Sequence, residues 1–261
     1  MKKMSPQRIA KQILLGTTLG DGNISLNGVK KARLRLGHGI CQLDYLLWKI
    51  KMLKPLVGSF SLSERKSLSW SKYAVFGSQT LTSRYLWHIY NDFYFERSGK
   101  IKKEIRSNVL NRLTPLSIAV WYMDDGCLGI YKTRGSNAGK LVPWRVSFAT
   151  HAHTYQEQEL VCEYFKRKWD ISFHILKQGD GHYVISDHKD THKFLELVKP
   201  YIIKSMRYKV DTSYQRTKHP DIMDDDVLRT LWEHRDLIRN VQTLTYKGNF
   251  VFNTEKIAVL A

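Results

Sequence analysis

The chain has 261 residues, 43% of them hydrophobic, and no low-complexity tract, so it predicts a compact globular protein of one large or two small domains. Lys and Arg outnumber Asp and Glu by 42 to 24, and the formal net charge of +18 favours a polyanionic partner over a neutral one. No uninterrupted apolar run has the length of a membrane-spanning helix and no basic amphipathic helix stands out, which argues against a membrane protein.

The cysteines point to a reducing environment. Cys41, Cys127 and Cys162 are odd in number, far apart and without the spacing of a metal site. The basic start of the chain is not followed by an apolar segment, so it does not predict a secretory signal. We therefore expect an intracellular protein, with a bacterial or phage cytoplasm, a mitochondrion and a chloroplast all left open.

The first predicted element is an apolar helical run that ends in LLGTTLGDG at residues 14–22. Hydrophobic patterning then predicts, in order, strands at 23–26 and 32–38, a helix at 42–53, strands at 59–64 and 69–76, and a helix at 80–94. The predicted order is therefore helix, two strands, helix, two strands, helix.

The same order returns in the second half of the chain. It begins with IAVWYMDDG at residues 118–126, after a proline that suits the first turn of a helix, and continues with strands at 127–132 and 144–150, a helix at 155–169, strands at 172–178 and 182–187, and a helix at 191–202. We predict a first repeat at 5–112, a second at 113–216, and a C-terminal extension at 217–261 that contains a helix after DIMDDD and a hairpin in LTYKGNFVF.

The ends of the two motif helices raise a chemical question. Gly16 and Gly20 lie four residues apart, on one helix face, where they allow another backbone to approach closely. If the two motif helices pack about a pseudo-twofold axis, the Asp-Gly ends at Asp21 and Asp125 meet. One Asp-Gly end alone would indicate only a capped helix, but two ends with the same element order favour a shared site. Two carboxylates at one point favour a divalent metal ion.

These motif copies resemble those of the LAGLIDADG homing endonucleases, of the single-chain, two-repeat kind encoded in mobile introns. The stretch LTPLSIAVWYMDDG at 113–126 is similar to the second copy in that group, and the resemblance covers about residues 5–216. It implies an α+β fold of two pseudo-symmetric αββαββα repeats, whose antiparallel sheets form a saddle over the DNA major groove. It also implies a metal-dependent double-strand cut in a long, non-palindromic site, made by a monomer.

The second motif copy departs from the first at two positions. It has Val120 in place of Gly16 and Asp124 in place of Gly20, so we expect asymmetric packing between the helices. Asp124 beside Asp125 also gives two candidates for the metal-binding carboxylate. The motif alignment favours Asp125 and leaves Asp124 a supporting role.

The resemblance therefore assigns Asp21 and Asp125 as catalytic metal ligands, with Mg²⁺ or another divalent cation such as Mn²⁺ as the cofactor. Hydrolysis of two phosphodiesters needs a metal ion to activate water and to stabilise the attacking and leaving oxygens. Backbone carbonyls of Gly20 and Asp124 are expected to complete the coordination.

Family members commonly place a lysine near the reacting water in each repeat. Lys103 follows Asp21 by nearly the same number of residues as Lys209 follows Asp125, which selects these two lysines. Lys102 is the alternative to Lys103, and phosphate contact is the alternative role for either.

DNA contacts are expected on the strands. Alternation puts Arg33 and Arg35 on one face of ARLRL, and Arg145 and Ser147 on one face of WRVSF. Such a ribbon fits the major groove, where arginine bonds to guanine. For any single residue a solvated surface position is an equal alternative. Weaker candidates of the same type are Ser61, Ser63, Arg65, Trp70, Lys72, Lys132, Arg134, Lys177 and His182.

Three functions compete at this point. They are a sequence-specific nuclease of double-stranded DNA, an RNA maturase that assists splicing of its host intron, and a non-catalytic DNA-binding relative. The presence of both aspartates weakens the third, whereas a basic saddle suits DNA and intron RNA alike. His38, His151 and His153 lack the spacing of a histidine-metal nuclease. The extension is expected to pack against the second repeat or to reach flanking DNA.

Overall fold

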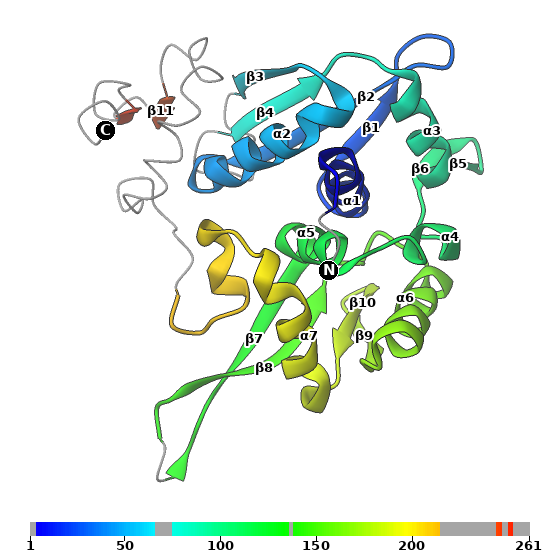
Figure 1. The fold of residues 1–261 in the computed structure, drawn as a ribbon. Coiled ribbons are helices and arrows are strands. Elements are labelled where there is room, and N and C mark those ends of the chain that lie inside the picture. The colour runs from blue at the N-terminus through cyan, green and yellow to red at the C-terminus, as the bar shows by residue number, and fades with distance from the viewer. Residues whose placement is uncertain (1–3, 66–74, 136–137, 215–243, 247–249, 253–261) are drawn as a thin grey trace.

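The structure is a computed structural model that describes residues 4–65, 75–135, 138–214, 244–246 and 250–252. It has the predicted α+β architecture, with helices and an open antiparallel sheet in each of two halves (Figure 1). Within these described residues, no helix has both the length and the apolar character that crossing a membrane requires.

The first half contains one four-stranded sheet and the helices that cover it. The strand order is β1-β2-β4-β3, with every neighbouring pair antiparallel. Its elements are α1 (Pro6–Leu19), β1 (Asn23–Leu26), β2 (Ala32–Gly39), η1 (Ile40–Gln42), α2 (Leu43–Val57), β3 (Phe60–Arg65), β4 (Val75–Thr80), α3 (Arg84–Phe93), β5 (Tyr94–Arg97), β6 (Lys100–Lys103) and α4 (Ser107–Leu110).

The second half repeats this arrangement, with the corresponding strand order β7-β8-β10-β9. Its elements are α5 (Pro115–Asp125), β7 (Gly126–Lys132), β8 (Leu141–Phe148), α6 (Tyr155–Trp169), β9 (Phe173–Gln178), β10 (Gly181–Ser186), η3 (His188–Asp190), α7 (Thr191–Val198), η4 (Lys199–Tyr201) and η5 (Lys204–Lys209). In the C-terminal extension, β11 (Leu244–Tyr246) pairs with β12 (Phe250–Phe252), as the hairpin prediction requires. The helix predicted after DIMDDD lies outside the described residues.

Two local predictions differ from the structure. The fourth strand was expected at 69–76; residues 69–74 lie outside the described residues, and β4 continues from Val75 to Thr80, beyond the predicted end, because Gly77 and the polar residues after it conceal this part of the strand in the sequence pattern. The ladder pairs Gly77 with Gly37, so two glycines occupy one position across the sheet. The β5–β6 hairpin was not predicted at all. Its turn places Ser98 and Gly99 at φ values of 51° and 73°, as a tight hairpin turn requires.

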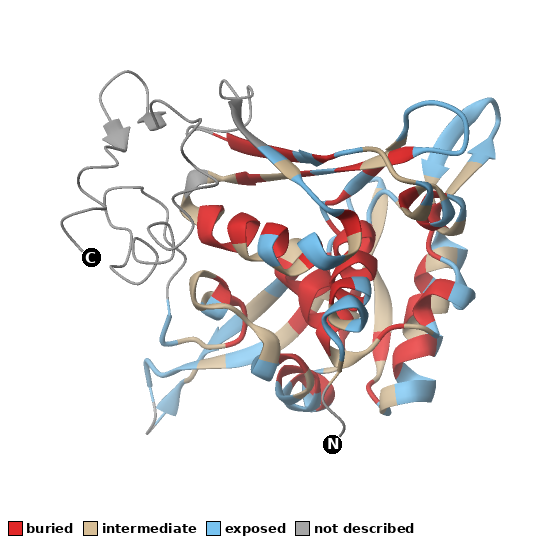
Figure 2. Ribbon diagram, turned by 45° about the horizontal axis from the view of Figure 1, so that its top comes forward, coloured by how far each residue is buried: buried red, intermediate tan, exposed pale blue. Residues whose placement is uncertain are grey.

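The motif helices α1 and α5 pack side by side in the centre of the molecule, with one sheet on each side of the pair (Figure 1). Each helix has a defined start. The Ser5 side chain accepts a hydrogen bond from the Arg8 amide, and Thr114 forms a capping box with Ser117. Figure 2 shows that buried residues gather in these central helices and in the strand residues that face them.

The glycines of the first motif make this close packing possible. A Cβ atom added to Gly16 would overlap the Ser117 carbonyl oxygen and lie 2.8 Å from Val120 Cβ, and one added to Gly20 would overlap Asp124 Cβ. Each glycine of the first copy therefore faces the larger residue at the same position of the second copy. The expected asymmetry is thus complementary, because a small residue lies opposite a large one.

Gly16→Ala is expected to destabilise the protein by about 1–3 kcal/mol, although alanine favours helices, because the added methyl group meets a backbone carbonyl of α5. Urea unfolding measures this loss. Gly39→Ala is the matched control, since no atom lies within 4 Å of a Cβ built there. Equal stability of the two variants would contradict the close-packing argument.

Candidate active site and nucleic-acid interface

The two motif carboxylates are positioned in different ways. Helix α1 ends at Leu19, so Asp21 lies just beyond it, where the Gly22 amide donates to the Thr17 carbonyl at 2.7 Å. Helix α5 instead includes Asp125 as its last residue. Asp125 is therefore fixed by its own helix, whereas Asp21 depends on contacts outside its helix.

Asp21 and Asp125 interact electrostatically. Desolvation raises the pKa of Asp125 to about 7, and the charges of Asp21 and Asp124 contribute to this rise. The pKa of Asp21 is also raised, first by desolvation and then by Asp124. Burial is thus the main cause of both shifts, and repulsion between the neighbouring carboxylates adds to it. A bound cation would relieve this repulsion.

A lysine reaches the end of each motif helix. The Lys103 Nζ atom, at the end of β6, donates to the Gly20 carbonyl at 2.6 Å and to the Leu19 carbonyl at 3.3 Å. The Lys209 Nζ atom, at the end of η5, donates to the Asp124 carbonyl at 3.1 Å and to the carbonyls of the two preceding residues. Carbonyls at a helix C-terminus carry partial negative charge, so both helices attract an ammonium group.

Lys103 and its neighbour Lys102 lie on opposite faces of β6. Lys102 is exposed, whereas Lys103 is half-buried at the end of α1. Desolvation lowers the pKa of Lys103, and the charges of Asp125, Asp21 and Asp124 oppose that change. Of the two lysines considered from the sequence, the structure thus places Lys103 beside the carboxylates.

The side chain of Asp124 belongs to a buried polar cluster that sequence reasoning missed. Lys49 of α2 donates to its two carboxylate oxygens at 2.6 and 2.8 Å, and the Tyr45 hydroxyl donates to it at 2.8 Å. The side chains of Lys49 and Asp124 are both 0% exposed. A lysine on the apolar face of a predicted helix was the available signal, because a buried ammonium needs an acidic partner.

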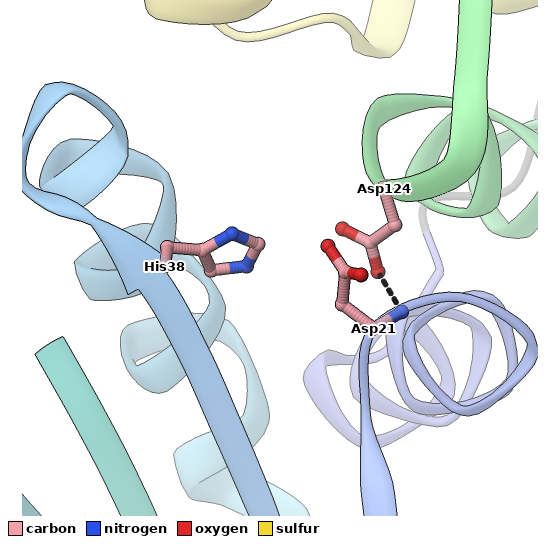
Figure 3. A group of neighbouring side chains, drawn as sticks. All are labelled: Asp21, His38 and Asp124. Carbon is pink, nitrogen blue, oxygen red and sulfur yellow. Dashed lines mark hydrogen bonds between the residues drawn. The ribbon is translucent and has the colours of Figure 1, made fainter. Parts of the chain in front are cut away.

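His38 of β2 lies beside this cluster. One ligand atom from each of Asp21, His38 and Asp124 lies within 4.8 Å of the others, a spacing that a metal ion can span (Figure 3). However, Lys49 Nζ lies 3.2 Å from His38 Nε2 and also binds Asp124. The Lys49 ammonium ion therefore already neutralises the Asp124 carboxylate of this group.

In the first sheet, the arginines lie on the face opposite the core. Leu34 and Leu36 of β2 are buried, and Arg33 and Arg35 alternate with them. Arg35 lies opposite Asn23 of β1 and Gln79 of β4, and Gln79 in turn lies opposite Ser61 of β3. A row of polar side chains thus crosses the sheet, and Asn23 and Gln79 were not among the predicted residues.

The second sheet has a comparable outer face. Arg145 and Ser147 alternate with the buried Val146 and Phe148 of β8. The row through Ser147 contains Cys127, Ile185 and His174, so it is less polar than the row through Arg35. Lys132 ends β7 and Arg134 follows it, both exposed at the far end of the β7–β8 hairpin.

The other predicted DNA-binding residues lie elsewhere. Lys177 and His182 pair with each other on the sheet face that carries the buried Val184, and the His182 ring packs edge-on against Tyr155 of α6, with 5.4 Å between the ring centroids. They therefore lie on the helix-covered face, away from Arg145. Arg65 ends β3, but its side chain is not described, and Lys72 lies outside the described residues.

Comparisons with known proteins agree with this geometry. The profile of the LAGLIDADG DNA endonuclease family matches residues 11–195. The chain is 28% identical over 208 residues to protein RecA of Mycolicibacterium fallax (76% of this chain, 45% of that one) and 29% identical over 213 residues to cytochrome b mRNA maturase bI2 of Saccharomyces cerevisiae (76% and 46%). It thus spans about half the length of these curated relatives.

Two further similarities span most of the other protein. DNA endonuclease I-ChuI of Chlamydomonas applanata is 28% identical over 218 residues, covering 79% of this chain and 96% of that one. The solved structure of the homing endonuclease I-WcaI bound to its DNA recognition sequence has a TM-score of 0.65 at 24% identity, and the match covers 80% of this chain and 89% of that one. The structural likeness shows that the two chains share a fold.

Proposed function

We propose, since this chain belongs to the LAGLIDADG DNA endonuclease family, that it makes a metal-dependent double-strand cut in a long, non-palindromic DNA site. The observation that carries the proposal is the pairing of two Asp-Gly helix ends between two sheets, each end with its own lysine. A pseudo-twofold site of this kind presents one carboxylate and one lysine to each strand of a duplex.

Asp21 and Asp125, with the carbonyls of Gly20 and Asp124, are the groups that would hold the metal ion. Carboxylate and carbonyl oxygens are the ligands that Mg²⁺ and Mn²⁺ prefer, and three carboxylates, those of Asp21, Asp124 and Asp125, act on one another at this place. When bound, the ion supplies activation of water and stabilisation of charge on the phosphate.

Lys103 and Lys209 supply the second source of positive charge. Each ammonium lies at the end of the motif helix of its own half, bonded to backbone carbonyls. A carbonyl oxygen has two lone pairs, so the same oxygen can also face a cation. We assign these lysines to the stabilisation of negative charge that develops on the scissile phosphates.

The outer faces of the two sheets are the proposed DNA interface. Arg33, Arg35, Arg145 and Ser147 lie on these faces, where they can enter the major groove. Gln79 joins them because it lies beside Arg35. One chain carries both faces, so a monomer is expected to read two different half-sites.

An RNA maturase function is the second candidate, favoured by the similarity to the bI2 maturase. The basic saddle suits either nucleic acid, so the proposal is tested by cutting. The purified protein is incubated with a library of randomised DNA duplexes and Mg²⁺, and the cut ends are sequenced. One long, non-palindromic site cut on both strands supports the proposal. No cut product, together with magnesium-dependent splicing of an intron RNA, would favour the maturase.

The first half is expected to supply more of the attraction to phosphates, because residues 1–112 carry 21 basic and 6 acidic side chains, against 15 and 11 in residues 113–216. Arg33→Gln with Arg35→Gln should therefore flatten the dependence of log K on log salt more than Lys132→Gln with Arg145→Gln. Each lost phosphate contact lowers the slope by about 0.9. Binding titrations at several salt concentrations measure this, and equal slopes would count against the unequal halves.

A further inference from the structure

The carboxylate of Asp124 connects the two halves of the molecule at the end of the motif helices. It belongs to α5, but its hydrogen-bond donors come from the first half. They are Lys49 at 2.6 and 2.8 Å, Tyr45 at 2.8 Å and the backbone amide of Asp21 at 3.2 Å. Figure 3 shows this last bond joining Asp124 to Asp21.

The support that Asp124 gives is one-sided. The equivalent position in the first copy is Gly20, which has no side chain to offer to Asp125. Asp125 does not need it, because it is the last residue of α5, whereas Asp21 lies beyond the end of α1. The second motif copy thus carries a polar group that the first copy lacks, and that group contacts the less supported carboxylate residue.

Stability alone does not account for this arrangement. Two buried charges lose their hydration, and a well-packed apolar pair of the same size is often as stable. What the ion pair adds is a fixed geometry, since a fully buried carboxylate with four hydrogen bonds has one orientation.

We propose that the Asp124 side chain is a positioning group for Asp21, oriented by Lys49 and Tyr45, and that it acts mainly on the cleavage of one DNA strand. This inference rests on the proposed function, in which each half acts on one strand. It concerns the side chain of Asp124, whereas the metal ligand expected from this residue is its backbone carbonyl.

The test removes the oxygen acceptor without leaving a buried charge unpaired. Asp124→Leu with Lys49→Met replaces both charges by apolar groups of similar size, and Tyr45 retains the Val120 carbonyl, 3.2 Å away, as an acceptor. Asp124→Asn with Lys49→Met also removes both charges but keeps an oxygen that can accept from the Asp21 amide. The two double variants therefore differ in the proposed interaction and share the loss of the ion pair.

Three properties of each protein are measured: stability by urea unfolding, hydrogen exchange of the Asp21 amide, and the cutting rate of each DNA strand. The substrate is the duplex selected by the wild-type protein, with its two strands labelled differently. With Asp124→Leu/Lys49→Met we expect the Asp21 amide to exchange at least about tenfold faster. One strand should be cut about 10–100-fold more slowly, the range for loss of a group that orients a metal ligand, and the other strand much less affected. In Asp124→Asn/Lys49→Met, the exchange rate of the Asp21 amide and the cutting rate of that strand should both be close to those of the wild-type protein.

Ser117→Ala is the control for a merely structural effect, since it removes a buried contact to Gln12 at the opposite end of the same helix pair. It should lower stability without a difference between the cutting rates of the two strands.

Tyr45→Phe is the milder variant if Asp124→Leu/Lys49→Met does not fold, and it should slow the same strand by several-fold. Equal slowing of both strands, or unchanged exchange of the Asp21 amide, would overturn the inference. Failure of the wild-type protein to cut would instead count against the proposed function, because the exchange measurement needs no DNA.

Discussion

Asp21→Asn and Asp125→Asn, made separately, are each expected to abolish double-strand cutting while DNA binding is retained or strengthened. Each change removes a carboxylate that is proposed to hold the metal ion, and a metal ion supplies several kcal/mol of transition-state stabilisation. The expected loss of rate is about 10³-fold or more. Loss of negative charge near the phosphates does not weaken their attraction to the protein.

Single-turnover cutting in Mg²⁺ and a binding titration in EDTA measure the two effects separately. Asp180→Asn is the matched control, because this aspartate lies exposed in the turn between β9 and β10. Cutting of both strands at the wild-type rate by either variant would remove the carboxylate-pair mechanism.

Lys103→Met and Lys209→Met are expected to lower the cutting rate by about 10²-fold with little change in affinity. Each ammonium lies at the end of a motif helix beside the acidic site, where it can stabilise charge that develops in the transition state. Rates at saturating enzyme, compared with dissociation constants from titration, separate the two quantities.

Lys102→Met provides a close control, since Lys102 is the exposed neighbour of Lys103 on β6. It removes the same charge and should leave the rate near that of the wild type. If the Lys103 and Lys209 variants lost affinity at an unchanged rate, these lysines would be reassigned to phosphate contacts.

The element order was predictable because it occurs twice. A single LLGTTLGDG pattern would indicate only a capped helix. Because IAVWYMDDG repeats the pattern and the same elements follow it, the two motif helices were expected to pair, as α1 and α5 do. The C-terminal end of β4 was harder to predict from the sequence, since Gly77 interrupts the alternation on which a strand prediction depends.

The buried cluster was not predicted because it forms between the halves. Lys49 and Asp124 are distant in the sequence, and their partnership depends on α2 of one half packing near the end of α5. The sequence also could not show which face of the second sheet carries Lys177 and His182. Alternation assigned them to one face, but only the register with β8 identifies that face as the one covered by helices.

Asp21 and Asp125 are proposed to hold divalent metal at the end of the motif helices. Anomalous scattering from Mn²⁺ in crystals of the protein bound to its selected duplex tests this proposal most directly. We expect Mn²⁺ density within coordination distance of each of the two carboxylates and of a DNA phosphate. A peak at the His38–Asp124 cluster, or none near Asp125, would contradict the account.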